Sequence, residues 1–178
     1  MARVLCVSGS PSTTSKSAAV LAHVASRLTA RSLEVETLAL RDLPAEDLLL
    51  ARFDAPAIVA AAAAVQAADG VVVATPIYKA AYSGLLKVFL DVLPQLGLTG
   101  KVVLPIATGG SLAHVLSLDY ALRPVLQSMN ARHVTAGYFV VDKLVTPKPE
   151  GGITLDGDTE SKLFEVVDGF LDALARVA

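Results

Sequence analysis

Short runs of continuous apolar residues, each followed at once by turn residues, recur along the chain and restrict the folds open to it. Three such runs are Arg3–Ser8, Gly70–Thr75 and Lys101–Thr108. A run without polar alternation predicts a strand buried on both faces, and such strands occur in parallel sheets that helices cover on each side. The chain is therefore expected to form a parallel α/β sheet, although Pro105 is unusual inside such a strand.

The segments between these runs show helical spacing or the alternation of a half-buried strand. Helices are predicted over Lys16–Arg31, Pro56–Ala68, Gly84–Leu93, Leu112–Met129 and Glu160–Val177, and further strands over Leu33–Leu40 and His133–Val141. Five strands thus alternate with helices, which predicts one domain over residues 1–178, apart from a polar stretch at 143–158. Because crossovers are right-handed, we expect a flavodoxin-like, doubly wound, five-stranded parallel sheet with strand order 2-1-3-4-5.

Charge and cysteine content exclude several classes of protein. Fifteen basic and seventeen acidic residues give a net charge of −2 without a long basic run, so no nucleic-acid partner is expected. Cys6 lies in an apolar run and is interpreted as an inert core thiol, and the three histidines lack the spacing of metal ligands. We find neither a signal peptide nor a membrane span, so the expected location is cytoplasmic.

The first of three unusual loops, Gly9–Ser15, follows the first predicted strand and leads into a helix. Ligands of such sheets bind beyond the carboxyl ends of the strands, and a helix N-terminus offers free N–H groups and partial positive charge. The predicted phosphate ligands are Ser10, Ser12, Ser15, Lys16 and Ser17. The loop matches neither a dinucleotide fingerprint nor a Walker loop, so a terminal monophosphate such as that of FMN fits better. The same hydroxyls are equally well explained as helix caps.

The other two loops follow the strands at Gly70–Thr75 and Lys101–Thr108. The second loop offers Pro76, Ile77, Tyr78 and Lys79, whose backbone and aromatic face suit the ring of a flavin. The third offers Thr108, Gly109, Gly110 and Ser111, where paired glycines free N–H groups to face a ligand. Taken in isolation, a loop tyrosine is better explained by surface or interface packing, and a simple turn explains paired glycines.

With these loops in place, the chain resembles the NADPH-dependent FMN reductase family, and most nearly the FMN reductases of alkanesulfonate utilisation. The matching segments, which spread over nearly the whole chain, are Gly9–Pro11, Leu48–Asp54, Thr75–Gly84, Leu86–Lys87, Gly100–Pro105, Ala107–Gly110 and Asp119–Leu122. One departure concerns position 12, where the family commonly has arginine and this chain has Ser12. The departure weakens the expectation of tight phosphate binding and of a preference for NADPH.

The resemblance implies a flavodoxin-like fold, FMN in the crevice, and NADPH, or else NADH, as the reductant. It implies that FMN is a substrate that leaves after reduction and supplies a flavin-dependent monooxygenase. It further implies a homotetramer, and a wide π-type turn at Tyr120 on the subunit interface that affects flavin retention. Hydride passes from nicotinamide to flavin in such a reaction, so no side-chain acid or base is nominated.

Other functions remain open from the residues alone. A quinone or azo-dye reductase shares the fold and keeps its FMN bound. A one-electron flavodoxin-type carrier is usually far more acidic than a chain with a net charge of −2. A flavin-binding protein without turnover is the least favoured interpretation. Retention of FMN through gel filtration separates the first alternative from a reductase that releases its flavin.

Overall fold

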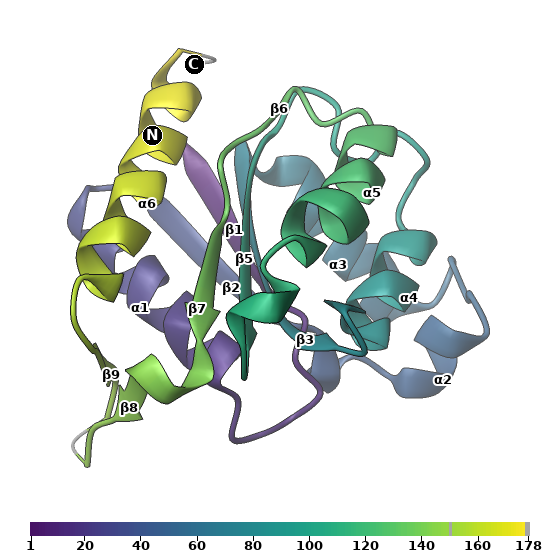
Figure 1. Ribbon diagram of the computed structural model, residues 1–178. Coiled ribbons are helices and arrows are strands. Elements are labelled where there is room, and N and C mark those ends of the chain that lie inside the picture. Colours follow the sequence, from purple (N-terminus) through teal and green to yellow (C-terminus); the bar gives the residue numbers. More distant parts are fainter. Residues whose placement is uncertain (150, 177–178) are drawn as a thin grey trace.

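A parallel sheet forms the centre of the computed structural model, which describes residues 1–149 and 151–176 (Figure 1). The strands of this sheet are β1 (Arg3–Ser8), β2 (Glu34–Ala39), β3 (Gly70–Tyr78), β5 (Val102–Gly109), β6 (His133–Val134) and β7 (Tyr138–Val141). They lie in the order β2-β1-β3-β5, and β6 and β7 both pair with the outer side of β5. When β6 and β7 are counted as one broken strand, the observed strand order confirms the predicted flavodoxin-like fold.

Helices cover both faces of the sheet, as the continuous apolar runs predict (Figure 1). One face carries α1 (Lys16–Ala30) and α6 (Thr159–Ala175), and the other carries α3 (Pro56–Ala67), α4 (Gly84–Val92) and α5 (Arg123–Ser128). Successive strand residues point to opposite faces. In β1, Cys6 therefore packs with α1 and α6 while Leu5 packs with α3 and α4. Both layers need apolar residues, which explains why the strands show no alternation.

The strand predicted over His133–Val141 is interrupted between β6 and β7. Thr135 donates its N–H to the Val103 carbonyl at 2.9 Å, so Val103 directs its backbone groups toward this neighbouring segment. Every second residue of a strand has the same orientation, so Pro105 also directs its backbone toward that segment. Pro105 has no N–H to offer there. A Cβ on Gly137 would lie 2.6 Å from the Pro105 carbonyl oxygen, so only glycine fits at this position without a shift of the backbone. The proline thus remains within a central strand at the cost of breaking its neighbour.

Several short elements were not anticipated from the sequence. A helix α2 (Ala45–Leu49) follows a 3₁₀ turn η1 (Leu40–Asp42), and a strand β4 (Ala81–Tyr82) folds back on the end of β3. The polar stretch 143–158 contains an antiparallel pair, β8 (Val145–Pro147) and β9 (Ile153–Leu155), after a 3₁₀ turn η4 (Asp142–Leu144). The predicted helix end at Val177 lies outside the described residues.

The helix predicted over Leu112–Met129 is three elements of different pitch. A 3₁₀ turn η2 (Leu112–His114) is followed by a π-helix η3 (Leu118–Leu122), which continues into α5. The wide turn that the family resemblance implies therefore lies at Tyr120. Such turns often mark functional sites.

Cys6 is fully buried between the two layers, and burial raises the pKa of its thiol to about 12. This environment confirms the interpretation of an inert core thiol, because the thiolate is the reactive form. Within residues 1–149 and 151–176, no helix combines the length and apolar character that crossing a bilayer requires. The same residues contain no cluster of three potential His, Cys, Asp or Glu metal ligands.

The crowding at Gly137 predicts that Gly137→Ala lowers the free energy of unfolding by about 1–3 kcal/mol, because a backbone carbonyl cannot move away cheaply. Gly169→Ala is the matched control, since Gly169 lies inside α6, where an added Cβ would meet nothing within 4 Å. Alanine there is expected to stabilise by about 0.5–1 kcal/mol. Urea denaturation of both variants measures the difference, and equal effects would contradict the role given to Gly137.

Candidate functional site

Three loops leave the carboxyl ends of β1, β3 and β5, and the parallel register brings them side by side. Ser8 pairs with Ala74, and Pro76 pairs with Thr108. A cavity of about 280 Å³ lies between the loops. Of the residues predicted from the sequence, those that line it are Ser10, Ser12, Ser15, Lys16, Ser17, Pro76, Ile77, Tyr78, Thr108, Gly109 and Gly110. Residues far apart in the chain therefore form one site.

Two predicted residues, Lys79 and Ser111, are not part of the cavity wall, and two wall residues were missed. The missed residues are Thr14 and Asp142. Thr14 belongs to the hydroxyl-rich loop, whose composition was the available signal. Asp142 directly follows β7, so its position at a strand's carboxyl end was the signal that would have identified it.

The hydroxyl groups of the first loop are ordered by hydrogen bonds within the loop. Ser15 caps α1 by accepting the Ala18 N–H at 3.1 Å, and its Oγ lies 2.9 Å from the Ser17 Oγ. The Ser12 Oγ accepts the Thr14 N–H at 3.2 Å. A hydroxyl that accepts a backbone N–H still has its own proton to donate. Helix capping and ligand binding are therefore compatible functions of this loop.

Two cationic side chains border the first loop from different parts of the chain. Lys16 donates from Nζ to the Asp142 carbonyl at 2.5 Å. Arg41 donates from Nη1 to the Ser12 carbonyl at 2.8 Å, although it follows β2 rather than β1. Arg41 is not among the residues predicted from the sequence. The position of Arg41 after the end of β2 could have identified it, because β2 pairs with β1 and ends beside it.

Ser83 joins the first loop to the second. Its side chain is 1% exposed, its Oγ donates to the Gly9 carbonyl at 2.5 Å, and the same oxygen accepts the Leu86 N–H at 3.1 Å. The Ser83 N–H in turn donates to the Thr75 Oγ1 at 3.0 Å. A single buried residue therefore caps α4 and sets the distance between two walls of the cavity.

The second loop is a tight hairpin with an unusual backbone. Lys79 and Ala80 both have positive φ values, +51° and +62°, between the paired residues Tyr78 and Ala81. Turns of this kind normally use Asn-Gly, and the left-handed conformation costs other residues roughly 1 kcal/mol each. Tyr78 borders the cavity and is 50% exposed, so its ring is available at the mouth and is not a core side chain.

The two glycines of the third loop have different structural causes. A Cβ on Gly109 would lie 2.9 Å from the Phe139 ring, so internal packing alone requires glycine there. A Cβ on Gly110 would meet nothing within 4 Å. Gly110 therefore leaves open space beside the cavity, and the next residue, Ser111, caps η2 by accepting the Ala113 N–H at 3.2 Å.

Apolar side chains are exposed along the segment that follows the third loop. Leu112, Leu116 and Tyr120 are 63%, 60% and 80% exposed, respectively. Tyr120 lies in the π-helix η3, which contacts β4 of the second loop. An exposed apolar surface of this kind is typical of a contact with another protein surface.

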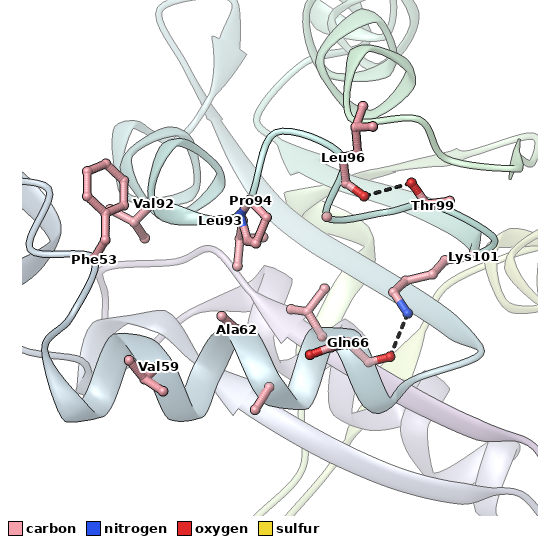
Figure 2. Close-up of a pocket in the computed structure, with 13 residues that line it drawn as sticks. Phe53, Val59, Ala62, Gln66, Val92, Leu93, Pro94, Leu96, Thr99 and Lys101 are labelled. Atoms are coloured by element: carbon pink, nitrogen blue, oxygen red, sulfur yellow. Dashed lines mark hydrogen bonds between the residues drawn. The ribbon is translucent and has the colours of Figure 1, made fainter.

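A larger cavity of about 590 Å³ lies elsewhere, between α3 and the end of α4, and Figure 2 shows its lining. Lys101, just before β5, donates from Nζ to the carbonyls of Gln66 and Ala68 at 2.9 and 2.7 Å, which caps the end of α3. Burial lowers the pKa of Lys101, although Asp69 opposes the shift. The cavity is lined by α3, the end of α4 and the connection to β5, and by no residue of the three loops. Lys101 has a structural role there.

Comparisons with known proteins show the family to which the chain is similar. A family model described as NADPH-dependent FMN reductase matches residues 2–146. The FMN reductase (NADPH) of Pseudomonas putida is 45% identical over 177 residues, which is 97% of this chain and 88% of that protein. The Escherichia coli K12 protein of the same description is 48% identical over 143 residues, covering 80% of this chain and 75% of that one.

A solved structure gives the same result. The crystal structure of an NADH:FMN oxidoreductase in its apo form superimposes with a TM-score of 0.89 at 41% identity, covering 97% of this chain and 90% of that chain. The family model spans all three loops and Asp142, so the similarity includes the cavity at the carboxyl edge of the sheet.

The position of Ser83 predicts that Ser83→Ala lowers the free energy of unfolding by about 2–4 kcal/mol. The variant loses a helix cap and leaves the Gly9 carbonyl without its buried donor. Ser26→Ala is the control, because the Ser26 hydroxyl is exposed and only bonds back to Ala22 in its own helix. Thermal and urea denaturation measure both variants, and a loss at Ser83 no larger than that at Ser26 would disprove its linking role.

Proposed function

This chain belongs to the NADPH-dependent FMN reductase family, and on that premise we propose that the cavity between its three loops is where FMN binds. The protein is an oxidoreductase that reduces FMN with a nicotinamide cofactor. One observation supports this site above the others: the hydroxyl-rich start of α1, Tyr78 and the unobstructed Gly110 all border the same cavity.

The first loop fits the phosphate end of FMN. The N-terminus of α1 presents backbone N–H groups and partial positive charge, and Ser10, Ser12, Ser15 and Ser17 add hydroxyl donors. Lys16 adds a full positive charge from the same helix start. A dianionic group is favoured in such surroundings, and a neutral sugar hydroxyl gains much less from them.

The other two loops fit the ring end. Ligand pockets usually measure about 300–1,000 Å³, and this cavity of about 280 Å³ lies just below that range. We infer that it encloses the phosphate and ribityl chain and leaves the ring at the mouth beside Tyr78. When bound there, FMN supplies the chemistry, which is the acceptance of a hydride from the nicotinamide. The open space at Gly110 allows backbone N–H groups to approach the pyrimidine edge of the ring.

We further propose that reduced FMN leaves this site and serves a flavin-dependent monooxygenase that desulfonates alkanesulfonates. The exposed mouth at Tyr78 supports release of the flavin. The segments Arg52–Asp54 and Asp119–Tyr120, which resemble the alkanesulfonate branch of the family, support the class of partner. The cytoplasm is the compartment that we propose, because the reduced nicotinamide consumed by the reaction is made there.

A flavin that is released predicts a colourless protein that reduces added FMN. Purified protein is expected to lose flavin on gel filtration and then to oxidise NADPH only when FMN is supplied. Steady-state rates with NADPH and with NADH give the preferred reductant. A yellow protein that reduces quinones or azo dyes while keeping its FMN would support the alternative reductase, and absence of any FMN turnover would disprove the proposal.

The apolar surface around Tyr120 supports a homotetramer, which we propose as the assembly. Because Tyr120 is 80% exposed in the single chain, Tyr120→Ala is expected to leave the melting temperature of the monomer fold unchanged. Loss of the side chain is expected to weaken the assembly or to increase flavin retention. Light scattering gives the mass in units of the 18.4 kDa chain, and the visible spectrum reports bound flavin. A colourless tetramer with unchanged FMN turnover would exclude this role for Tyr120.

A further inference from the structure

We propose that Arg41 is a positioning residue for the flavin phosphate, acting from the end of β2 on the loop that follows β1. The inference rests on the proposed function, because it takes the first loop as the phosphate site. The observation behind it is the hydrogen bond from Arg41 Nη1 to the Ser12 carbonyl at 2.8 Å. Ser12 itself lines the cavity, so the guanidinium is bonded to a residue of the cavity wall.

Register and burial fix the place of Arg41. The end of β2 pairs with the end of β1, where Ala39 lies opposite Ser8. The next residue, Leu40, is fully buried and anchors the 3₁₀ turn η1 in the core. Arg41 follows this anchor and its side chain reaches across to the first loop, where it remains 32% exposed. Its guanidinium is therefore held in place and is still reachable from the solvent.

The bond to Ser12 has a defined electrostatic effect on the loop. A carbonyl oxygen carries partial negative charge that would repel a nearby phosphate, and the hydrogen bond from Arg41 offsets that charge on the Ser12 oxygen. Within the described residues, the other contact of Arg41 is Asp42, whose Oδ1 lies 3.5 Å from Nε and whose side chain is 71% exposed. A guanidinium has five N–H donors, so most of them remain for an anion or for water.

The cation at the helix start does not make Arg41 redundant. Lys16 is tied to the Asp142 carbonyl on another wall of the cavity. The hydroxyl groups of the loop are neutral, whereas a phosphate monoester carries about −1.5 to −2 charges near neutral pH. Two cations bordering the loop match that charge.

The test compares FMN with riboflavin, which has the same ring and ribityl chain without the phosphate. Binding is measured by quenching of flavin fluorescence, which requires no turnover. Arg41→Ala is expected to weaken FMN binding at least tenfold and riboflavin binding less than twofold. Arg41→Lys, which restores the charge but not the fork of donors, is expected to recover part of the FMN affinity.

Arg31→Ala is the matched control, because Arg31 carries the same charge at the other end of α1 and is 54% exposed. This control is expected to leave both flavins unaffected, and added salt is expected to shrink the difference between wild type and Arg41→Ala for FMN. Equal losses for FMN and riboflavin would overturn the inference and leave Arg41 a structural residue. If Arg41→Ala left FMN binding unchanged but raised the KM for NADPH and not the KM for NADH, that result would also overturn the inference. In both cases FMN turnover by the wild type would still support the reductase, whereas a wild type that neither binds nor reduces FMN would remove the proposed function itself.

Discussion

The geometry of the site depends on one buried hydroxyl group. Ser83 donates to the carbonyl of Gly9 while accepting an N–H from the first turn of α4, so the loop after β1 and the loop after β3 share one anchor. Gly9 is packed so closely that a Cβ would lie 3.0 Å from Leu86, a residue of that same helix. Sheet register brings the loops to one edge, and this anchor then fixes their spacing. The spacing of two cavity walls is thus fixed by a buried hydrogen-bonded residue, which suits a site where geometry decides the rate.

The sequence allowed the layers and the strand order to be predicted, because continuous apolar runs have only one common explanation. It did not reveal the break between β6 and β7, which depends on Pro105 meeting Gly137 across two strands. The turn at Lys79 and Ala80 could not be predicted from the sequence either, because neither residue favours positive φ and the surrounding hairpin imposes it. Most cavity residues were identified because loops at the carboxyl ends of parallel strands must converge. Asp142 and Arg41 were missed because their side of the site is built by tertiary pairing and not by a local motif.

Arg41 also changes how the serine at position 12 is interpreted. From the sequence, Ser12 looked like the loss of a cation from the first loop. In the folded chain, a guanidinium reaches the same residue from the neighbouring strand and bonds to its carbonyl. A cation therefore borders the first loop from the end of the neighbouring strand, and only the pairing of β2 with β1 brings it there.

The interrupted strand at the edge of the sheet has a consequence for the protein in solution. An unpaired edge normally presents a row of free N–H and C=O groups with which another extended chain can pair, and this leads to aggregation. Here the outer edge is divided into β6, with two residues, and β7, with four, separated by a bend at Gly137. Neither piece is long enough to act as a template for a foreign strand. The proline within β5 is therefore associated with a divided outer edge, which disfavours edge-to-edge pairing with a foreign strand.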